Sequence, residues 1–249
     1  MFKTRADDAT TKSLPARLPA DRRDMFQAIY QQRLWGFERR AKFFSGVGSR
    51  GPAADAYVSA MVDQLSSDLG ELGATAVLVD LGCGDFVVGR SLLQRLPQLT
   101  YVGCDIVPGL ITHNHRAYAS NGIRFRDLDM VTDELPDGDI CLVRQVFQHL
   151  SNADISAVLP KLRKFRRVYV TEAHPTSPDG RINPDKPTGY DVRFNYLTGH
   201  GSGVELDRPP WNLRLVEICR TPRLVDGQEV LVTHRVFFPA ADELQAVGK

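Results

Sequence analysis

An acidic residue and two glycines follow a short apolar run in the first half of the chain. The run Val77–Leu81 reads VLVDL, includes Asp80, and continues as Gly82-Cys83-Gly84. Two glycines directly after a strand let the backbone pass close to a ligand, and the following helix presents its N-terminal N–H groups there. The alternative is a tight strand-to-helix turn that binds nothing. The segment is the first candidate for a ligand-binding turn.

A second acidic residue, Asp105, closes the next predicted strand. Doubly wound folds place a carboxylate about 20 residues beyond the glycine turn, where it accepts hydrogen bonds from ribose hydroxyls. The spacing therefore predicts a nucleoside ligand. The third glycine of the dinucleotide fingerprint is missing because Val87 occupies its place, which argues against a nicotinamide cofactor.

Short apolar runs alternate with helical segments between residues 77 and 172, which is typical of βαβ units. Strands are expected at Val77–Leu81, Thr100–Cys104, Ile123–Arg126, Ile140–Val143 and Arg167–Glu172, and helices at Val88–Arg95, Ile111–Ser120 and Ala153–Lys164. Two β-rich runs, Leu213–Cys219 and Glu229–Phe237, flank the turn dipeptide Asp226-Gly227 and predict an antiparallel hairpin. We expect an α/β fold with a doubly wound, Rossmann-like, mostly parallel sheet that this hairpin closes.

The first 72 residues precede this alternation and form a separate predicted unit. Residues 1–20 are polar and indicate a loose arm, and helical spacing begins behind the candidate cap Asp21 and reaches Leu34. The segment Trp35 to Pro52 has a loop composition, and Ala53–Leu72 returns to a helical period. We therefore divide the chain into an N-terminal arm with helices and a loop, residues 1–72, and a core, residues 73–249.

A long segment from Pro175 to Trp211 is rich in Pro, Gly, Asp and Asn. Loops of this length in compact domains are usually functional or disordered, and we interpret this one as an acceptor-binding loop. Its polar and aromatic members are Asp179, Asn183, Asp185, Asp191, Arg193, His200, Tyr190, Phe194 and Trp211. A divalent metal is the alternative use of the acidic residues, but scattered aspartates more often cap turns, and no metal site is expected.

Composition excludes several classes of protein. The 249 residues carry a formal net charge of +1, with 43% hydrophobic and 24% charged residues, which predicts a globular protein without the basic surface of a nucleic-acid-binding domain. No signal peptide or membrane-spanning run is evident, so we expect a cytoplasmic location. Cysteines 83, 104, 141 and 219 are scattered singly and should be free thiols.

Residues 77–172 resemble the class I S-adenosylmethionine-dependent methyltransferases. The resemblance implies that the acidic-x-Gly-x-Gly turn holds the amino acid end of the cofactor, that Asp105 binds ribose, and that the acidic residue after the third strand meets adenine. Many members have a further glycine where this chain has Phe86, so no role is carried over there. In this part of the chain the implied cofactor-binding residues are Asp80, Gly82, Gly84, Asp105, Ile106, Asp129, Met130 and Arg144.

Three further segments narrow the resemblance to a bacterial subgroup, often found in saccharide or natural-product pathways. They are Trp35-Gly36, Ser45-Gly46-Val47-Gly48-Ser49 and the run from Arg144 to Leu150, which reads RQVFQHL. The resemblance implies a small-molecule or glycan acceptor, and adds Trp35, Ser45 and Gly48 to the cofactor-binding residues. Trp35 to Ser49 is then a lid with glycine hinges; a plain surface loop is the alternative.

Methyl transfer is an in-line displacement that needs alignment of the two reactants and, for a hydroxyl acceptor, a base. Candidate bases at the predicted strand ends are His149, Glu172 and His174. The chain is expected to use S-adenosylmethionine, to release S-adenosylhomocysteine and to methylate oxygen. Methylation of a protein or amine nitrogen, a non-catalytic cofactor-binding module and a nicotinamide-dependent reductase are the alternatives. The sequence leaves the oligomeric state open.

Overall fold

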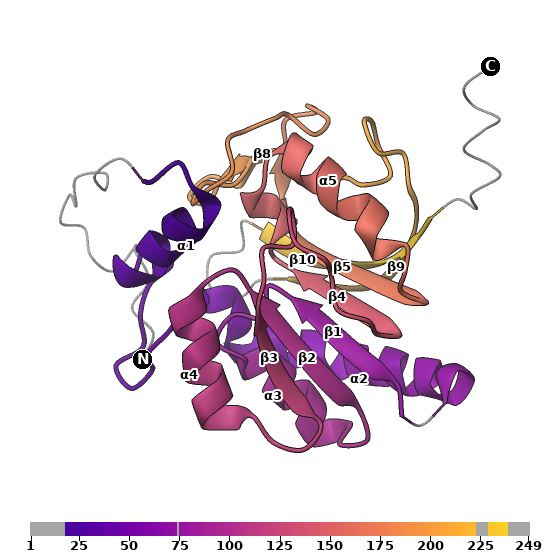
Figure 1. Cartoon of the computed structure of the whole chain (residues 1–249). Helices are drawn as coiled ribbons and strands as arrows, with labels where there is room; N and C mark the ends of the chain where they lie inside the picture. The colour runs from indigo at the N-terminus through magenta and orange to yellow at the C-terminus, as the bar shows by residue number, and fades with distance from the viewer. Residues whose placement is uncertain (1–17, 74, 223–228, 239–249) are drawn as a thin grey trace.

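The computed structural model describes residues 18–73, 75–222 and 229–238, and a seven-stranded sheet forms its centre (Figure 1). Its strands are β1 (Val77–Leu81), β2 (Thr100–Asp105), β3 (Ile123–Asp127), β4 (Ile140–Arg144), β5 (Arg167–Pro175), β9 (Arg214–Pro222) and β10 (Glu229–Phe237). They lie in the order β3-β2-β1-β4-β5-β10-β9. Strands β1 to β5 pair in parallel, and β10 pairs antiparallel with both β5 and β9. The doubly wound sheet with an antiparallel hairpin is confirmed.

Helices cover both faces of the sheet (Figure 1). They are α1 (Arg22–Gln31), α2 (Gly51–Leu72), α3 (Val87–Arg95), α4 (Pro108–Tyr118) and α5 (Asn152–Leu162), with short 3-10 turns η2 (Val47–Ser49) and η3 (Phe147–His149). Helices α2 and α3 share one hydrophobic cluster, and α1 and α5 share the other. The sheet is therefore the middle layer of three.

Successive residues of the central strands point to opposite faces, as pleated strands require. Leu78 and Leu142 are buried in the cluster of α2 and α3, whereas their neighbours Val79 and Val143 are buried in the cluster of α1 and α5. Burial on both faces explains why β1 and β4 each begin with several consecutive apolar residues rather than with alternating polar and apolar ones.

Local signals fix most helix ends. Asp21 caps α1 as predicted, since its carboxylate accepts a hydrogen bond from the N–H of Asp24. The predicted start of α4 at Ile111 is wrong: the helix begins at Pro108, where the fixed φ of proline suits the first turn. The predicted end of α5 at Lys164 is also late, because the helix ends at Leu162.

The segment after β5 was expected to be a loop, but it contains a small second sheet. Strands β6 (Ser177–Pro178), β7 (Phe194–Asn195) and β8 (His200–Gly201) lie in the order β6-β8-β7. The two-residue strands are too short to carry a periodic signal in the sequence. The predicted turn Asp226-Gly227 and most of the predicted N-terminal arm, residues 1–17, lie outside the described residues.

The helices of the described ranges include no membrane span, and the side chains of these ranges include no cluster of metal ligands. None of these helices is both long and apolar enough to cross a bilayer. Within the same ranges, no three His, Cys, Asp or Glu side chains are grouped so that they could hold a metal ion. All four cysteines are free, as predicted.

Candidate functional site

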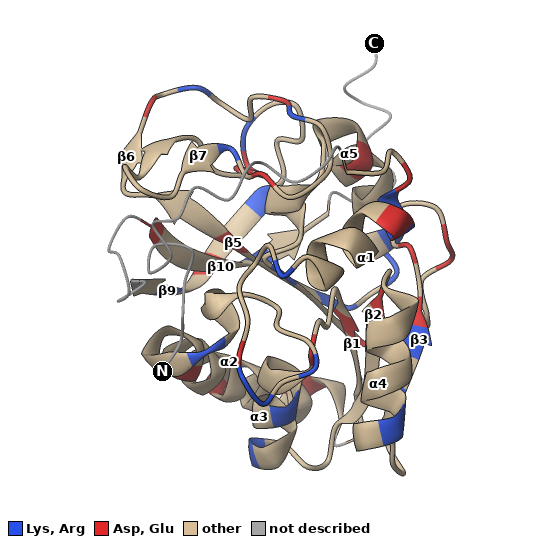
Figure 2. Ribbon diagram, turned by 90° about the vertical axis from the view of Figure 1, so that its left-hand side faces the viewer, with Lys and Arg blue, Asp and Glu red and all other residues tan. Residues whose placement is uncertain are grey.

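A cavity of about 1400 Å³ lies where the parallel strands of the sheet end. Residues that follow β1, β2, β3 and β4 line it, and so do residues of α1 and of the segment between α1 and α2. The strand order reverses between β1 and β4, and open α/β sheets bind ligands at such a point. Figure 2 shows acidic residues at the ends of β1 and β2, beneath α1.

The structure brings the predicted cofactor-binding residues together on this cavity. It is lined by all of them: Trp35, Ser45, Gly48, Asp80, Gly82, Gly84, Asp105, Ile106, Asp129, Met130 and Arg144. Among the predicted bases, His149 lines the cavity, whereas Glu172 and His174 do not. Trp211, a member of the expected acceptor-binding loop, also lies away from the cavity, and its indole N–H donates to the hydroxyl of Ser156.

The two glycines of the turn after β1 are required by the packing of neighbouring loops. Gly82 has a φ of +79°, and a Cβ there would lie 2.3 Å from Cγ2 of Val146. Gly84 has a φ of +54°, and its Cβ would lie 2.4 Å from Oγ of Ser45. The N–H groups of Gly82 and Gly84 donate to the carbonyl of Cys104 and to the carboxylate of Asp105, respectively.

Two buried carboxylates and one guanidinium face the cavity beside this turn. Burial raises the pKa of Asp80 to about 6, although the hydroxyl of Tyr101 donates to it at 2.6 Å and Arg144 lowers the value. Burial also raises the pKa of Asp105 to about 6. The N–H groups of Gly84 and Val107 each donate to one oxygen of Asp105, which fixes that carboxylate and leaves lone pairs for a ligand.

The carboxylate of Asp129, which was expected to contact adenine, is bonded to Arg22, a residue that sequence reasoning missed. Arg22 of α1 donates through Nε and Nη2 to Oδ2 of Asp129, at 3.0 and 2.9 Å. It also reaches Asp154 of α5, at 3.2 Å. The other oxygen of Asp129 accepts the N–H of Val131. Arg22 stands at the start of a helix far from this motif in the chain, and no local pattern predicts the pairing.

The segment between α1 and α2, predicted as a lid, is bonded to the glycine turn. The Ser45 hydroxyl accepts the N–H of Asp85 at 2.8 Å and lies 2.9 Å from the hydroxyl of Tyr30. Arg50 forms an ion pair with Asp85, at 2.7 Å, and both side chains are largely buried. Sequence reasoning missed Arg50 and Asp85. The side chain of Arg144 also donates to the carbonyl of Gly48.

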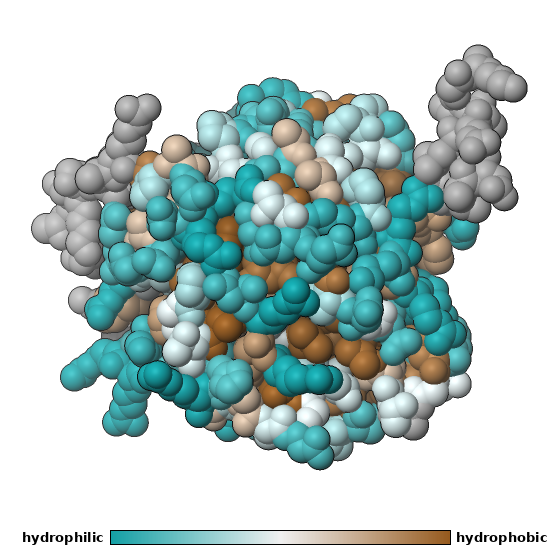
Figure 3. Space-filling model, viewed as in Figure 1, coloured by the Kyte–Doolittle hydropathy of each residue, from teal (hydrophilic) through white to brown (hydrophobic). Residues whose placement is uncertain are grey.

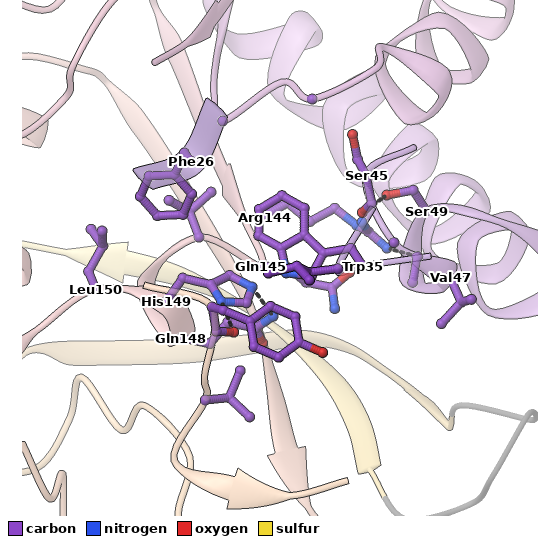
Figure 4. Close-up of a pocket in the computed structure, with 18 of the residues that line it drawn as sticks. Phe26, Trp35, Ser45, Val47, Ser49, Arg144, Gln145, Gln148, His149 and Leu150 are labelled. Atoms are coloured by element: carbon purple, nitrogen blue, oxygen red, sulfur yellow. Dashed lines mark hydrogen bonds between the residues drawn. The ribbon is translucent and has the colours of Figure 1, made fainter. Parts of the chain in front are cut away.

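His149 projects into the cavity from η3, close to Trp35 and Gln148 (Figure 4). Its Nδ1 lies 3.2 Å from the carbonyl of Tyr190, which can only accept, so Nδ1 carries the proton and Nε2 the lone pair. Nε2 lies 3.2 Å from Nε2 of Gln148, whose Oε1 accepts the N–H of Ala173. Burial lowers the pKa of His149 to about 4, which keeps the ring neutral at physiological pH.

Comparison with known proteins gives a family for the central part of the chain. Residues 79–167 match a family model described as a methyltransferase domain. No curated protein sequence matches the chain. The chain therefore shares the class I methyltransferase fold, and residues 79–167 are similar to a methyltransferase domain.

Solved structures of methyltransferases share this fold at low sequence identity. The 1,6-didemethyltoxoflavin-N1-methyltransferase of Burkholderia thailandensis is 19% identical, over 90% of this chain and 94% of that one, with a TM-score of 0.56. The N-methyltransferase NodS of Bradyrhizobium japonicum is 15% identical, over 83% and 97%, with a TM-score of 0.54. Human N-acetylserotonin methyltransferase is 16% identical with a TM-score of 0.52; the match covers 88% of this chain and 60% of the human one.

Glu172 and Arg193 bind the backbone of the turn that carries His149. The carboxylate of Glu172 accepts the N–H groups of Val146, Phe147 and Gln148, at 3.2, 2.9 and 2.9 Å. The guanidinium of Arg193 donates to the carbonyls of Phe147, Gln148 and Leu150, at 3.4, 3.5 and 3.0 Å, and to Oδ1 of Asn152. The predicted acceptor loop thus contacts the turn after β4 directly.

Glu172 and His174 are poorly placed to accept a proton from a ligand in the cavity. Glu172 is 2% exposed, and burial raises its pKa to about 7 while its oxygens accept backbone N–H groups. His174 packs beside His234, with ring centroids 6.4 Å apart, and burial lowers its pKa to about 4. The geometry leaves His149 as the one predicted base that lines the cavity.

Proposed function

We propose that this chain transfers a methyl group from S-adenosylmethionine to a hydroxyl oxygen of a small-molecule acceptor. The observation that carries the proposal is the charge arrangement of the cavity wall, where Asp80, Asp105 and Arg144 meet at the switch point of the sheet. A zwitterionic amino acid with an attached ribose needs one cation, one anion and a further carboxylate, and this wall offers those three groups.

The residues present fit the proposed cofactor. Arg144 can pair with its carboxylate and Asp80 with its ammonium group, while the lone pairs left on Asp105 can accept the ribose hydroxyls. Ile106 and Met130 line the cavity as apolar side chains and can pack on a base. Because Arg22 holds the carboxylate of Asp129, we assign adenine to the apolar surfaces and the backbone nearby rather than to that carboxylate.

When bound, the cofactor supplies an electrophilic methyl carbon: the acceptor oxygen bonds to it, and the carbon–sulfur bond breaks with its electron pair on sulfur. His149 is the proposed acceptor of the hydroxyl proton. Its Nε2 lone pair faces the amide of Gln148, so the hydroxyl must replace this hydrogen bond. Tyr190 holds the opposite ring nitrogen and so orients the ring.

The observation that favours a second candidate, methylation of an amine, is the weak basicity of His149. Burial lowers the pKa of His149 to about 4, and a neutral amine acceptor needs no base before it attacks. The two candidates predict different pH profiles. An amine acceptor must lose its own proton before it attacks, so turnover would rise with pH around the pKa of the acceptor. A hydroxyl acceptor would instead make turnover depend on the base, so turnover would fall in a His149 variant.

The proposal is tested by calorimetry and turnover. S-adenosylhomocysteine should bind the wild-type chain and raise its melting temperature, whereas NAD should not. In the presence of labelled S-adenosylmethionine and extracts, label should enter a small molecule. With that acceptor, His149→Asn should lose about 10²–10⁴-fold in turnover and keep its affinity for S-adenosylhomocysteine. If S-adenosylhomocysteine does not bind, the proposed cofactor is wrong. If it binds but no acceptor is methylated, the chain is a non-catalytic cofactor-binding module.

A further inference from the structure

The walls of the cavity differ in chemistry. Asp80, Asp105 and Arg144 form what we call the charged wall. The turn after α1, the turn η3 and the segment after β5 supply the rings of what we call the aromatic wall, namely Trp35, His149, Tyr190, Phe194 and Tyr196. The rings of Trp35 and His149 have centroids 5.1 Å apart, and those of Phe194 and Tyr196 lie 4.9 Å apart.

Trp35 carries a buried donor that the fold does not use. Its indole ring packs against Tyr30, Phe26 and His149, so its position is fixed. Its Nε1 is inaccessible to solvent and has no hydrogen-bond partner among the described residues. Figure 4 shows the ring in the middle of the pocket residues. Buried N–H groups without a partner are rare in folded proteins, and this one belongs to a residue that lines the cavity.

Three polar side chains near the aromatic wall are already bonded to the protein. Oδ1 of Asn195 accepts the N–H groups of Leu197 and Thr198, and the amide of Gln148 bonds to His149 and Ala173. The guanidinium of Arg193 is bonded to backbone carbonyls. A saccharide has a hydroxyl on most of its carbons and needs several such partners, whereas a flat ring needs only the aromatic surfaces.

Apolar side chains are also exposed at this side of the cavity. Leu197 lines it and is 80% exposed, and Tyr196 is 37% exposed. Leu197 is far more exposed than the other large hydrophobic residues of the described chain, and hydrophilic side chains dominate the face seen in Figure 3. A ligand that covered Leu197 and Tyr196 would remove apolar surface from water.

We propose that the methyl acceptor is a planar aromatic molecule whose reacting hydroxyl stands beside a hydrogen-bond-accepting atom. The ring lies on the aromatic wall, its hydroxyl faces His149, and its neighbouring oxygen or ring nitrogen accepts the N–H of Trp35. This inference rests on the proposed function. It also reassigns Trp35, which the sequence resemblance gave to the cofactor, to the acceptor.

The chain offers a direct readout because it has two tryptophans, Trp35 and Trp211. In a Trp211→Phe protein, the single indole N–H resonance in an isotope-labelled sample belongs to Trp35. Trp211 lies outside the cavity and bonds to Ser156, so its replacement leaves the site intact. Catechol is the probe, trans-cyclohexane-1,2-diol is its non-aromatic match with the same two hydroxyls, and methyl glucoside represents a saccharide.

With S-adenosylhomocysteine at saturation, catechol should move the indole resonance downfield and saturably, and the two non-aromatic probes should not. Trp35→Phe keeps a ring but removes the donor, so its affinity for catechol should fall about three- to tenfold, the share of one neutral hydrogen bond. Its affinity for S-adenosylhomocysteine should stay within twofold of wild type.

Three outcomes would overturn the inference. Methyl glucoside could move the resonance in place of catechol, catechol could bind without moving it, or Trp35→Phe could weaken S-adenosylhomocysteine instead of catechol. The last result would return Trp35 to the cofactor. Failure of S-adenosylhomocysteine to bind the parent protein is a different result, because it removes the proposed function itself.

Discussion

The charged wall and the aromatic wall of the cavity are built in different ways. Asp80 and Asp105 stand at the ends of adjacent strands, and short-range backbone bonds hold them within the sheet. The aromatic wall instead depends on the segment that follows β5. Arg193 of this segment donates hydrogen bonds to the turn after β4, which lies more than forty residues earlier in the chain. The difference suggests that one wall is as rigid as the sheet, whereas the other can change between acceptors without rebuilding the fold.

The largest effect should come from the glycine turn beside the charged wall, through Gly82→Ala. A Cβ at Gly82 would collide with Val146 and would sit at a φ of +79°. We expect a loss of about 2–5 kcal/mol in unfolding free energy from overpacking and backbone strain, together with loss of S-adenosylhomocysteine binding. Gly180 has the same φ with open space around it and is the matched control. Gly180→Ala should cost about 1–2 kcal/mol and leave binding unchanged; equal losses in the two variants would contradict the packing argument.

The second prediction concerns the pH dependence contributed by Glu172. Burial raises its pKa from 4.5 to about 7, so the folded state holds the proton more tightly than the unfolded state. Its contribution to stability is therefore present below about pH 4.5 and is lost as the pH rises through about 7. The stability of wild type relative to Glu172→Gln should fall by about 3 kcal/mol across this interval, since one pKa unit is worth about 1.4 kcal/mol. Denaturant unfolding of both proteins at several pH values measures it, and parallel curves would refute it.

The third prediction separates the two walls by function. Arg193→Lys keeps the charge but loses the planar set of donors that reaches several carbonyls of the turn carrying His149. We expect kcat to fall about ten- to a hundredfold, because misplacement of a reacting group by about 1 Å has such effects. The affinity for S-adenosylhomocysteine should be unchanged. Arg181→Lys, in an exposed arginine of the same segment that pairs with Asp179, is the control. A loss of cofactor binding in Arg193→Lys would show that the walls are not independent.

The fourth prediction tests Asp105 as the ribose ligand. Asp105→Asn keeps the shape but has one accepting oxygen in place of two, so S-adenosylhomocysteine should bind about tenfold more weakly, the scale of one charge-assisted hydrogen bond. Asp127, paired with Asp105 in the sheet register and pointing outside the cavity lining, is the control. Calorimetry that finds the same affinity for Asp105→Asn and Asp127→Asn would remove the assignment.

The smallest expected effect is in the segment Trp35–Ser49. Ser45 is already bonded to the glycine turn, and the adjoining Arg50 pairs with Asp85. The segment is therefore already held against the turn, and the cofactor should stabilise it only a little further. Amide hydrogen exchange in this segment should slow on addition of S-adenosylhomocysteine, while exchange in the small sheet of β6, β7 and β8 should stay the same. Equal protection with and without the ligand would mean that the segment is a fixed wall and not a lid.

The sequence predicts the charged wall better than the aromatic wall for a physical reason. Val77–Leu81 and its glycines form a strand and a turn through local preferences, and their predicted bounds match β1. The start of α4 could also have been predicted from the sequence, because α4 begins at Pro108 and proline is common as the first residue of a helix. The pairing of Arg22 with Asp129 and the bonds of Arg193 join segments that only folding brings together, so no spacing in the chain announces them.

The direction of β10 has a practical consequence for handling the protein. Glu229, the first residue of β10, pairs with Pro175, the last residue of β5, near the strand ends that border the cavity. Phe237, the last residue of β10, therefore lies at the opposite ends of the strands. Helix α1, in contrast, places Arg22 in the cavity wall itself. A surface linker or fluorescent label attached after β10 would therefore leave the mouth of the site open to solvent, whereas a rigid fusion partner joined just before α1 would stand at that mouth.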